Sequence, residues 1–191
     1  MATPPQAVIL AGPNGAGKTT AAKGLLPSGI EYVNADIIAQ RLTGRSDAPG
    51  EMEAMRIELA EIERLVAARQ SFAVETTLAP KAFEKRIIQW QAAGYRVGLF
   101  FVFLSSPELS IERVRLRVDR GGHHVPDDVI RRRYQEGLRN FFSKYRHLVD
   151  EWQLLDNTGS QTQSVAWASN ESGLIIDNPS LWSTLEGRYV L

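Results

Sequence analysis

A glycine-rich loop near the start of the chain constrains its fold more than any other feature. Residues 12–19 read GPNGAGKT, which matches the pattern G-x-x-x-x-G-K-S/T without a gap. Glycine at three of these positions lets successive backbone N–H groups turn inward and line a concave anion site. A lysine in this place provides a positive charge for the β- and γ-phosphates of a nucleotide, and the threonine hydroxyl after it can bind Mg²⁺. The predicted triphosphate site consists of Gly12, Pro13, Asn14, Gly15, Ala16, Gly17, Lys18, Thr19 and Thr20, with Thr19 as the metal ligand.

The segments on either side of the loop have the pattern that such a site requires. Residues 6–11 form a short apolar run typical of a buried strand, and residues 20–26 have the composition of a helix. The further predicted strands are 31–34, 71–75, 96–104 and 151–156, with a terminal hairpin of 164–168 and 173–177 within residues 161–178. The predicted helices are 36–42, 51–70, 80–93, one from Pro107 and one from Asp127, and the turn-rich segment 43–50 is predicted to be a mobile loop. This alternation predicts an α/β fold of the P-loop NTPase class, with three layers (α/β/α), a mostly parallel central sheet and segment 96–104 as its central strand.

The composition bounds the number of domains and the class of partner. With 191 residues, the chain is long enough for one compact domain, residues 1–191, and too short for a second of ordinary size. Lysine plus arginine equals aspartate plus glutamate at 22 each, so no overall charge draws the molecule to nucleic acid or an anionic membrane. The absence of cysteine excludes disulfides, thiolate nucleophiles and cysteine zinc sites. Since the N-terminus has neither a charged leader nor a run long enough to span a membrane, we expect a cytoplasmic protein.

Polar side chains follow the second and third predicted strands. They are Asn34 and Asp36 after the second strand, and Glu75, Thr76 and Thr77 at the end of the third. Because the carboxyl ends of parallel strands meet at one edge of a sheet, we expect these residues to border the same cleft as the phosphate loop and to contact a substrate. Asp36 is placed to accept the proton of an attacking hydroxyl as a catalytic base, and aspartate here is equally suited to cap the helix that follows.

Glu75 ends an otherwise apolar strand, where a carboxylate needs a partner if it is buried. It is suited to bind an acceptor hydroxyl, or to hold a water of the Mg²⁺ shell in the manner of a Walker B acid. A surface carboxylate at a strand end is the third interpretation. Thr76 and Thr77 would add hydroxyl donors to the same pocket.

Arginines are concentrated in the segment after the predicted central strand. Nine of the 17 arginines lie between Arg113 and Arg146. Three share one face of a predicted helix and three more begin the next helix, with a glycine-containing turn between them. These two sets are Arg113, Arg117 and Arg120, and Arg131, Arg132 and Arg133. We predict that residues 113–133 form a lid whose arginines face a bound triphosphate, because a guanidinium binds phosphoryl oxygens through two parallel hydrogen bonds.

Two other interpretations of this segment remain, a solvated charged helix pair and a basic patch for nucleic acid. Aromatic residues from Tyr134 to Tyr145 recur at helical spacing, which favours packing on the core over base stacking. His123 and His124 in the turn point in different directions and have no cysteine or carboxylate cluster beside them. We therefore expect a substrate contact or a hinge there rather than a metal site.

Together these motifs resemble the zeta toxin family of P-loop kinases. Four blocks carry the resemblance between Val8 and Asn157, namely residues 12–20, 33–39, 72–78 and 113–134. The resemblance implies phosphorylation of the 3′-hydroxyl of the amino sugar in UDP-N-acetylglucosamine by ATP with Mg²⁺, and restraint by a small helical antitoxin. It implies Asp36 as the base, Lys18 as the phosphate lysine, Glu75 as a substrate-binding acid, and Arg117 with Arg133 as phosphate-clamping arginines, the neighbouring Arg113, Arg120 and Arg132 being also available.

The sequence thus predicts an ATP- and Mg²⁺-dependent kinase that phosphorylates a hydroxyl of a small molecule, with a sugar nucleotide as the expected acceptor. A nucleoside, nucleotide or polynucleotide 5′-kinase would use the same loop, base and arginines. A nucleotide-dependent switch without an acceptor substrate is the alternative from another class. Against the switch, strand 96–104 is followed by Ser105 and Ser106 rather than by Asp-Glu.

Overall fold

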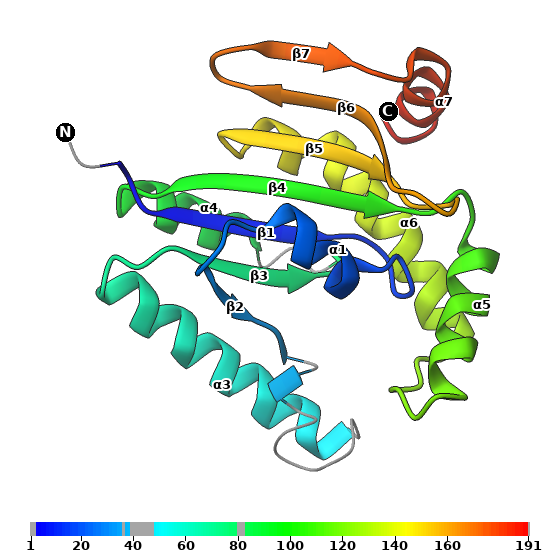
Figure 1. Ribbon diagram of the computed structural model, residues 1–191, viewed down its shortest axis with the longest axis horizontal. Coiled ribbons are helices and arrows are strands. Elements are labelled where there is room, and N and C mark those ends of the chain that lie inside the picture. The colour runs from blue at the N-terminus through cyan, green and yellow to red at the C-terminus, as the bar shows by residue number, and fades with distance from the viewer. Residues whose placement is uncertain (1–2, 36, 39–47, 80–82, 191) are drawn as a thin grey trace.

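A seven-stranded sheet organises the structure (Figure 1). The computed structural model describes residues 3–35, 37–38, 48–79 and 83–190. The strands are β1 (Gln6–Ala11), β2 (Glu31–Val33), β3 (Phe72–Thr76), β4 (Arg96–Phe103), β5 (Glu151–Asp156), β6 (Gln163–Ser169) and β7 (Gly173–Ile176). Their order is β2-β3-β1-β4-β5-β6-β7, with β1 to β5 parallel and β6 and β7 antiparallel.

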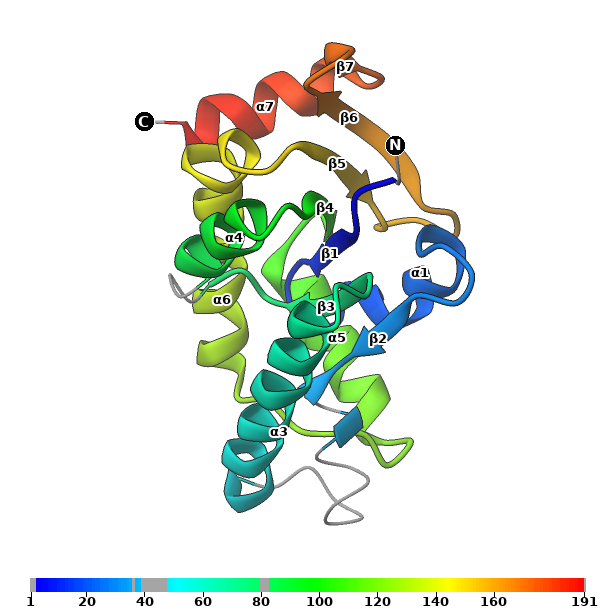
Figure 2. The same cartoon turned by 90° about the vertical axis from the view of Figure 1, so that its left-hand side faces the viewer.

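Helices lie on both faces of this sheet (Figure 2). They are α1 (Lys18–Leu25), α3 (Ala48–Ala67), α4 (Phe83–Ala92), α5 (Pro107–Val118), α6 (Asp127–Ser143) and α7 (Pro179–Tyr189), with a short 3₁₀ turn η1 at Tyr145–His147. The helices α4, α6 and α7 lie on one face and α1 on the other. This is the P-loop kinase-like α/β fold, so the predicted fold class is confirmed, and β4 is the middle strand.

Two apolar cores, one on each face, hold β4 in the middle of the sheet. Leu99, Phe101 and Phe103 belong to the larger core, which also includes buried side chains of α3, α4, α6 and α7. Val102 points the other way and joins the smaller core beside α1. Because its side chains enter apolar cores on both faces, β4 is a nearly continuous apolar run rather than an alternating pattern.

The structure moves several helix boundaries from the predicted positions. The helix α3 begins at Ala48, so residues 48–50 of the predicted loop are helical, while residues 43–47 lie outside the described residues. Of the predicted helix 36–42, only residues 37 and 38 are described, and both are helical. The helix α4 is described from Phe83 onward, and Pro80 lies outside the described part of the chain.

The helix α7 is not predicted by the sequence analysis, which ends at the terminal hairpin. Its N-terminus nevertheless carries two ordinary signals. The Asn178 side chain accepts a hydrogen bond from the Leu181 backbone N–H at 3.1 Å, and Pro179 occupies the first turn. The helix buries Trp182, Leu185 and Tyr189 against α6 and β6, and so completes the larger core.

Replacing Trp182 by alanine should lower the free energy of unfolding by about 3–5 kcal/mol, the usual cost of a large aromatic-to-alanine change in a core. The Trp182 ring is buried and stacks on Trp152 at 5.7 Å between centroids, with Phe142 at 5.4 Å. Urea denaturation followed by circular dichroism measures this change. Trp167→Ala is the matched control, because Trp167 is only half-buried and should lose much less. Equal losses in the two variants would contradict the placement of α7 in the core.

Candidate functional site

The phosphate loop connects β1 to α1, and its three glycines have backbone conformations that other residues rarely adopt. The φ angles are +140° at Gly12, +78° at Gly15 and +83° at Gly17. A Cβ atom on Gly12 would lie 1.9 Å from the Val102 carbonyl oxygen, and one on Gly15 would lie 2.6 Å from the Ser110 carbonyl oxygen. The loop is therefore packed directly against β4 and α5, and only glycine fits at these positions.

Lys18 begins α1 and folds back over the loop. Its side chain is buried, and its Nζ donates hydrogen bonds to the carbonyl oxygens of Gly12 and Pro13, each at 3.0 Å. The same Nζ lies 3.5 Å from Oε1 of Glu75. The ammonium group is thus held at the mouth of the loop by two carbonyl dipoles and one carboxylate.

The Glu75 carboxylate binds side chains from two other segments of the chain. Its Oε2 accepts hydrogen bonds from Thr19 Oγ1 at 2.9 Å, from Asn34 Nδ2 at 2.9 Å and from the Tyr32 hydroxyl. Thr19 follows β1, Tyr32 is on β2, and Glu75 is on β3. The structure therefore brings together Lys18, Thr19, Asn34 and Glu75, the first two predicted for phosphate and metal and the last two for substrate.

Tyr32 is a member of this cluster that the sequence analysis does not identify. Its hydroxyl accepts a hydrogen bond from Asn34 Nδ2 at 3.1 Å and donates one to Glu75. Burial, followed by the negative charge of Glu75, raises the pKa of the Tyr32 hydroxyl far above its usual value. The group is therefore a protonated donor at any working pH. In the sequence, the signal for this role is a tyrosine two residues before Asn34 in the predicted strand 31–34.

The remaining residues at this edge have different positions. The Asn34 side chain is buried, and its Oδ1 accepts a hydrogen bond from the Ile37 backbone N–H at 3.3 Å. Thr76 Oγ1 accepts one from the Leu78 backbone N–H at 3.1 Å, and Thr77 is half-buried. Asp36, the predicted base, lies outside the described residues. The substrate contacts predicted for Asn34, Thr76 and Thr77 stay predictions.

Three arginines of α5 and the turn after it help to line a cavity of about 430 Å³, and one of them, Arg113, lies against Gly15 of the loop. Its lining is Arg113, Leu116, Arg117, Arg120, Gly121 and Gly122. Arg113 donates a hydrogen bond to the Thr158 carbonyl at 3.0 Å, and Arg117 donates one to the His123 carbonyl at 2.9 Å. No described residue accepts a hydrogen bond from the buried Nε of Arg117. This nitrogen is buried, so the structure shows an unsatisfied donor beside the cavity and not one exposed in it.

The arginines of α6 do not all face the loop. Arg133 does, and its guanidinium donates a hydrogen bond to the Asn14 side chain at 3.4 Å. Arg131 instead forms an ion pair with Glu108 at 2.6 Å on the surface, and Arg132 is exposed. The expectation that the arginines of both helices face inward therefore holds for Arg133 but is wrong for Arg131, because consecutive helical residues point about 100° apart.

Asn157, which follows β5, is a second residue that the sequence analysis does not identify as part of the site. Its Nδ2 donates a hydrogen bond to the Ala16 carbonyl at 2.8 Å, and a Cβ atom on Gly17 would lie 2.7 Å from this nitrogen. Its Oδ1 accepts a hydrogen bond from Thr162 at 2.8 Å. The side chain therefore supports the loop from the side opposite β3.

The oxygen donors at the loop fit Mg²⁺ better than a transition metal. Mg²⁺ is usually held by one or two protein oxygens together with substrate phosphates. The Thr19 hydroxyl and the Glu75 carboxylate are of this kind, and they are in contact. The described residues contain no group of three or more histidine, cysteine, aspartate or glutamate side chains arranged for a metal ion.

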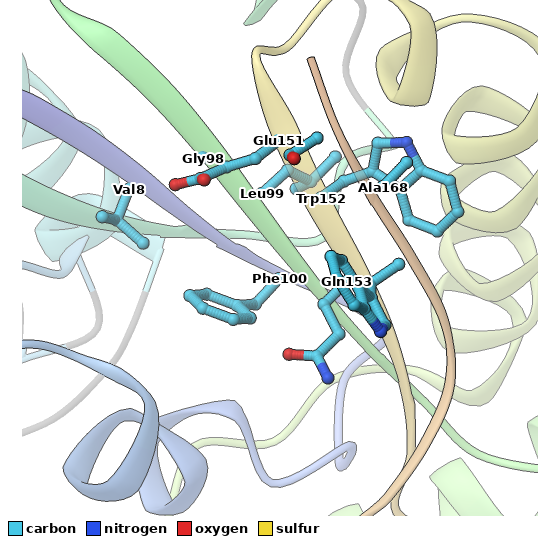
Figure 3. A pocket seen from close by; sticks show the side chains of 10 residues that line it. Val8, Gly98, Leu99, Phe100, Glu151, Trp152, Gln153 and Ala168 are labelled. Carbon is cyan, nitrogen blue, oxygen red and sulfur yellow. The ribbon is translucent and has the colours of Figure 1, made fainter. Parts of the chain in front are cut away.

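A separate hollow of about 410 Å³ lies over the sheet on the face that carries α1 (Figure 3). Phe100, Gln153 and Trp167 contribute to its lining from β4, β5 and β6. It contains none of the predicted site residues.

Among the described helices, none combines the length and apolar character needed to cross a membrane.

Comparison with known proteins supports this description of the fold. A protein-family model described as an AAA domain (AAA_33) matches residues 8–141. An uncharacterized protein of Haemophilus influenzae is 23% identical over 129 residues, a match that covers 68% of this chain and 92% of that protein.

Two solved structures extend the comparison. AvrRxo1-ORF1 in complex with ORF2 and ATP has a TM-score of 0.75 at 18% identity, over 95% of this chain and 63% of that one. The chain therefore spans less than two thirds of that relative's length. A structure from the PezAT chromosomal toxin–antitoxin system of Streptococcus pneumoniae has a TM-score of 0.64 at 20% identity, over 82% of this chain and 69% of that one. At these identities the likeness shows a shared fold.

Asn157→Ala should weaken ATP binding by up to about tenfold, since one hydrogen bond that orders the loop is worth roughly 0.5–1.5 kcal/mol. Isothermal titration calorimetry with ATP and Mg²⁺ measures the change. Asn178→Ala is the control, because it removes an asparagine hydrogen bond at the distant start of α7. An unchanged ATP affinity in Asn157→Ala would show that the loop keeps its shape without this support.

Proposed function

The chain belongs to this AAA-domain family, and from that premise we propose that it is an ATP- and Mg²⁺-dependent phosphotransferase acting on a hydroxyl of a small molecule. The observation that carries the proposal is the cluster of Lys18, Thr19 and Glu75 at the phosphate loop, next to the arginine-lined cavity. Phosphoryl transfer needs positioning and charge neutralisation more than covalent chemistry, and these groups supply both.

In this proposal the phosphate loop holds the donor. Backbone N–H groups of the loop and the N-terminus of α1 face the phosphates, and Lys18 moves from the loop carbonyls to the β- and γ-phosphates. Arg117 and Arg133 neutralise charge that develops on the transferred group, with Arg113 and Arg120 beside them. Two observations support this role, since Arg117 and Arg120 line one cavity and Arg133 contacts Asn14 of the loop.

Thr19, through its hydroxyl, and Glu75, through its carboxylate, would hold Mg²⁺ in the proposed complex. The ion would supply positive charge that neutralises the phosphate groups. The contact between Thr19 and Glu75 favours this assignment of Glu75 over contact with an acceptor hydroxyl. Asn34 then serves to hold Glu75 and to begin the following turn, since its Nδ2 donates to Glu75 and its Oδ1 accepts a hydrogen bond from the Ile37 N–H.

The acceptor half of the site is assigned from the sequence. Asp36 follows β2 in the sequence and is proposed as the base that takes the proton of the attacking hydroxyl. Thr77 and His123 are the proposed substrate contacts on the two sides. The resemblance to zeta toxins makes UDP-N-acetylglucosamine the first acceptor to test, and a small helical antitoxin the first partner. The likeness to a chain of the PezAT toxin–antitoxin system supports the choice of partner.

Incubation with ATP, Mg²⁺ and UDP-N-acetylglucosamine should give a sugar nucleotide heavier by one phosphate, with ADP in equal amount, and mass spectrometry measures both. Chelation of Mg²⁺ by EDTA should abolish the product. Nucleosides and oligonucleotides are incubated in parallel. If one of them is phosphorylated and the sugar nucleotide is not, the acceptor is a nucleoside or a polynucleotide 5′-end. Tight ATP binding with no product from any acceptor would refute phosphotransfer in favour of a nucleotide-dependent switch.

Asp36→Asn should lower the rate of transfer by about 10²–10⁴-fold, the usual contribution of a positioned general base. ATP affinity, measured by calorimetry, should be nearly unchanged because Asp36 is not proposed to contact the donor. Lys18→Ala is the contrasting variant, since it should weaken ATP binding itself. Unaltered transfer by Asp36→Asn would remove the assignment of this residue as the base.

A further inference from the structure

The Glu75 carboxylate is held asymmetrically. Three donors, Thr19, Tyr32 and Asn34, converge on Oε2, while Oε1 faces the Lys18 ammonium at 3.5 Å. That separation is longer than a direct charge-assisted hydrogen bond, which is about 2.7–2.9 Å. Lys18 donates instead to two loop carbonyls at 3.0 Å. The carboxylate is therefore kept close to Lys18 without forming a tight ion pair.

Tyr32 differs from the other two donors in its position. Thr19 belongs to the loop, and its hydroxyl is also the proposed metal ligand, whereas the Asn34 amide divides its donors between Tyr32 and Glu75. The Tyr32 hydroxyl comes from β2, the edge strand next to β3, and it accepts a hydrogen bond on one side while donating one on the other. This hydrogen bond thus fixes the position of the Glu75 carboxylate relative to β2.

We propose that Tyr32 is a positioning residue that holds Glu75 away from Lys18, so that the lysine stays available for phosphate and the carboxylate for the Mg²⁺ shell. The inference rests on the proposed function in assigning Lys18 and Glu75 to those partners. Without the tyrosine hydroxyl, attraction between the opposite charges draws Glu75 onto Lys18. A tight pair of this kind competes with the nucleotide for the lysine and removes the acid from the metal.

Tyr32→Phe tests this role because it removes only the hydroxyl. ATP affinity is measured by calorimetry in Mg²⁺ and, separately, in EDTA. Loss of one hydrogen bond to a charged group predicts about a tenfold weaker affinity in Mg²⁺. The gain in affinity that Mg²⁺ provides should also shrink. Tyr32→Leu, a second side chain without a hydroxyl, should behave in the same way and serves in place of Tyr32→Phe if that variant does not fold.

Two comparisons separate positioning from a general structural effect. Tyr95→Phe is the matched control, since Tyr95 is a buried tyrosine whose hydroxyl donates to the Leu65 and Gln70 carbonyls, far from the loop. It should leave ATP affinity unchanged. In a Glu75→Gln background, Tyr32→Phe should cause little further loss, because Tyr32 is proposed to act through Glu75.

The inference is overturned if Tyr32→Phe binds ATP like the wild type, or if its loss is as large in the Glu75→Gln background as in the otherwise unaltered protein. All of these measurements use ATP binding alone. If the protein phosphorylates no acceptor, the proposed function is wrong, but the role of Tyr32 is still tested by the ATP-binding measurements.

Discussion

The close approach of the phosphate loop to three neighbouring segments is the constraint on which the site depends. Gly12 lies against β4, Gly15 against α5, and Gly17 against the Asn157 side chain, each closer than a Cβ atom would allow. The loop is therefore not a free turn that closes around a ligand. Its shape is set by the core of the sheet on one side and by the arginine-bearing helix on the other, which fixes the backbone donors before any anion arrives.

This arrangement concentrates charge in a molecule that has none overall. Lys18 is almost fully buried, and burial of an ammonium group is costly unless partners compensate for the lost water. The loop carbonyls and Glu75 provide that compensation, and Thr19, Tyr32 and Asn34 do the same for Glu75. The partners come from β2 and the residue after it and from the loop and helix that follow β1. Because β3 lies between β2 and β1, the sheet order makes the cluster possible.

Much of the fold could be predicted because its signals are local. The phosphate loop is one continuous motif, and strands such as β4 are apolar runs bounded by turns. The partners of Glu75 could be predicted only in part. Asn34 and Glu75 follow neighbouring strands, but the contact with Tyr32 depends on the pairing of β2 with β3, which no single segment encodes. The predicted base, Asp36, lies outside the described residues.

The arginine segment shows the same limit. Helical spacing says which arginines share a face, but it does not say which face meets the loop. Packing determines the orientation of α6. Because Tyr134 and Leu138 are buried in the core, the neighbouring Arg133 lies where it contacts Asn14 of the loop. The helix α7 was missed for another reason. Its start signals, Asn178 and Pro179, are present, but its burial depends on aromatic side chains of α6 and β5.

The two arginine-bearing helices are anchored very differently. Along α6, Gly137 touches the Thr77 carbonyl, Phe141 lies in the main core, and Tyr134 donates a hydrogen bond to the Leu104 carbonyl at 2.6 Å. The paired faces of α5 and the start of α6 share only a small apolar cluster of their own, Ile111, Val114, Val125 and Ile130. Tilting α6 would pull aromatic rings out of the main core. The helix α5 instead packs aliphatic side chains, such as Leu109 and Ile111, into the two smaller apolar clusters. Arg133 is thus tied to the main core of the sheet, while the arginines of α5 are tied to the phosphate loop, which packs against this helix at Gly15.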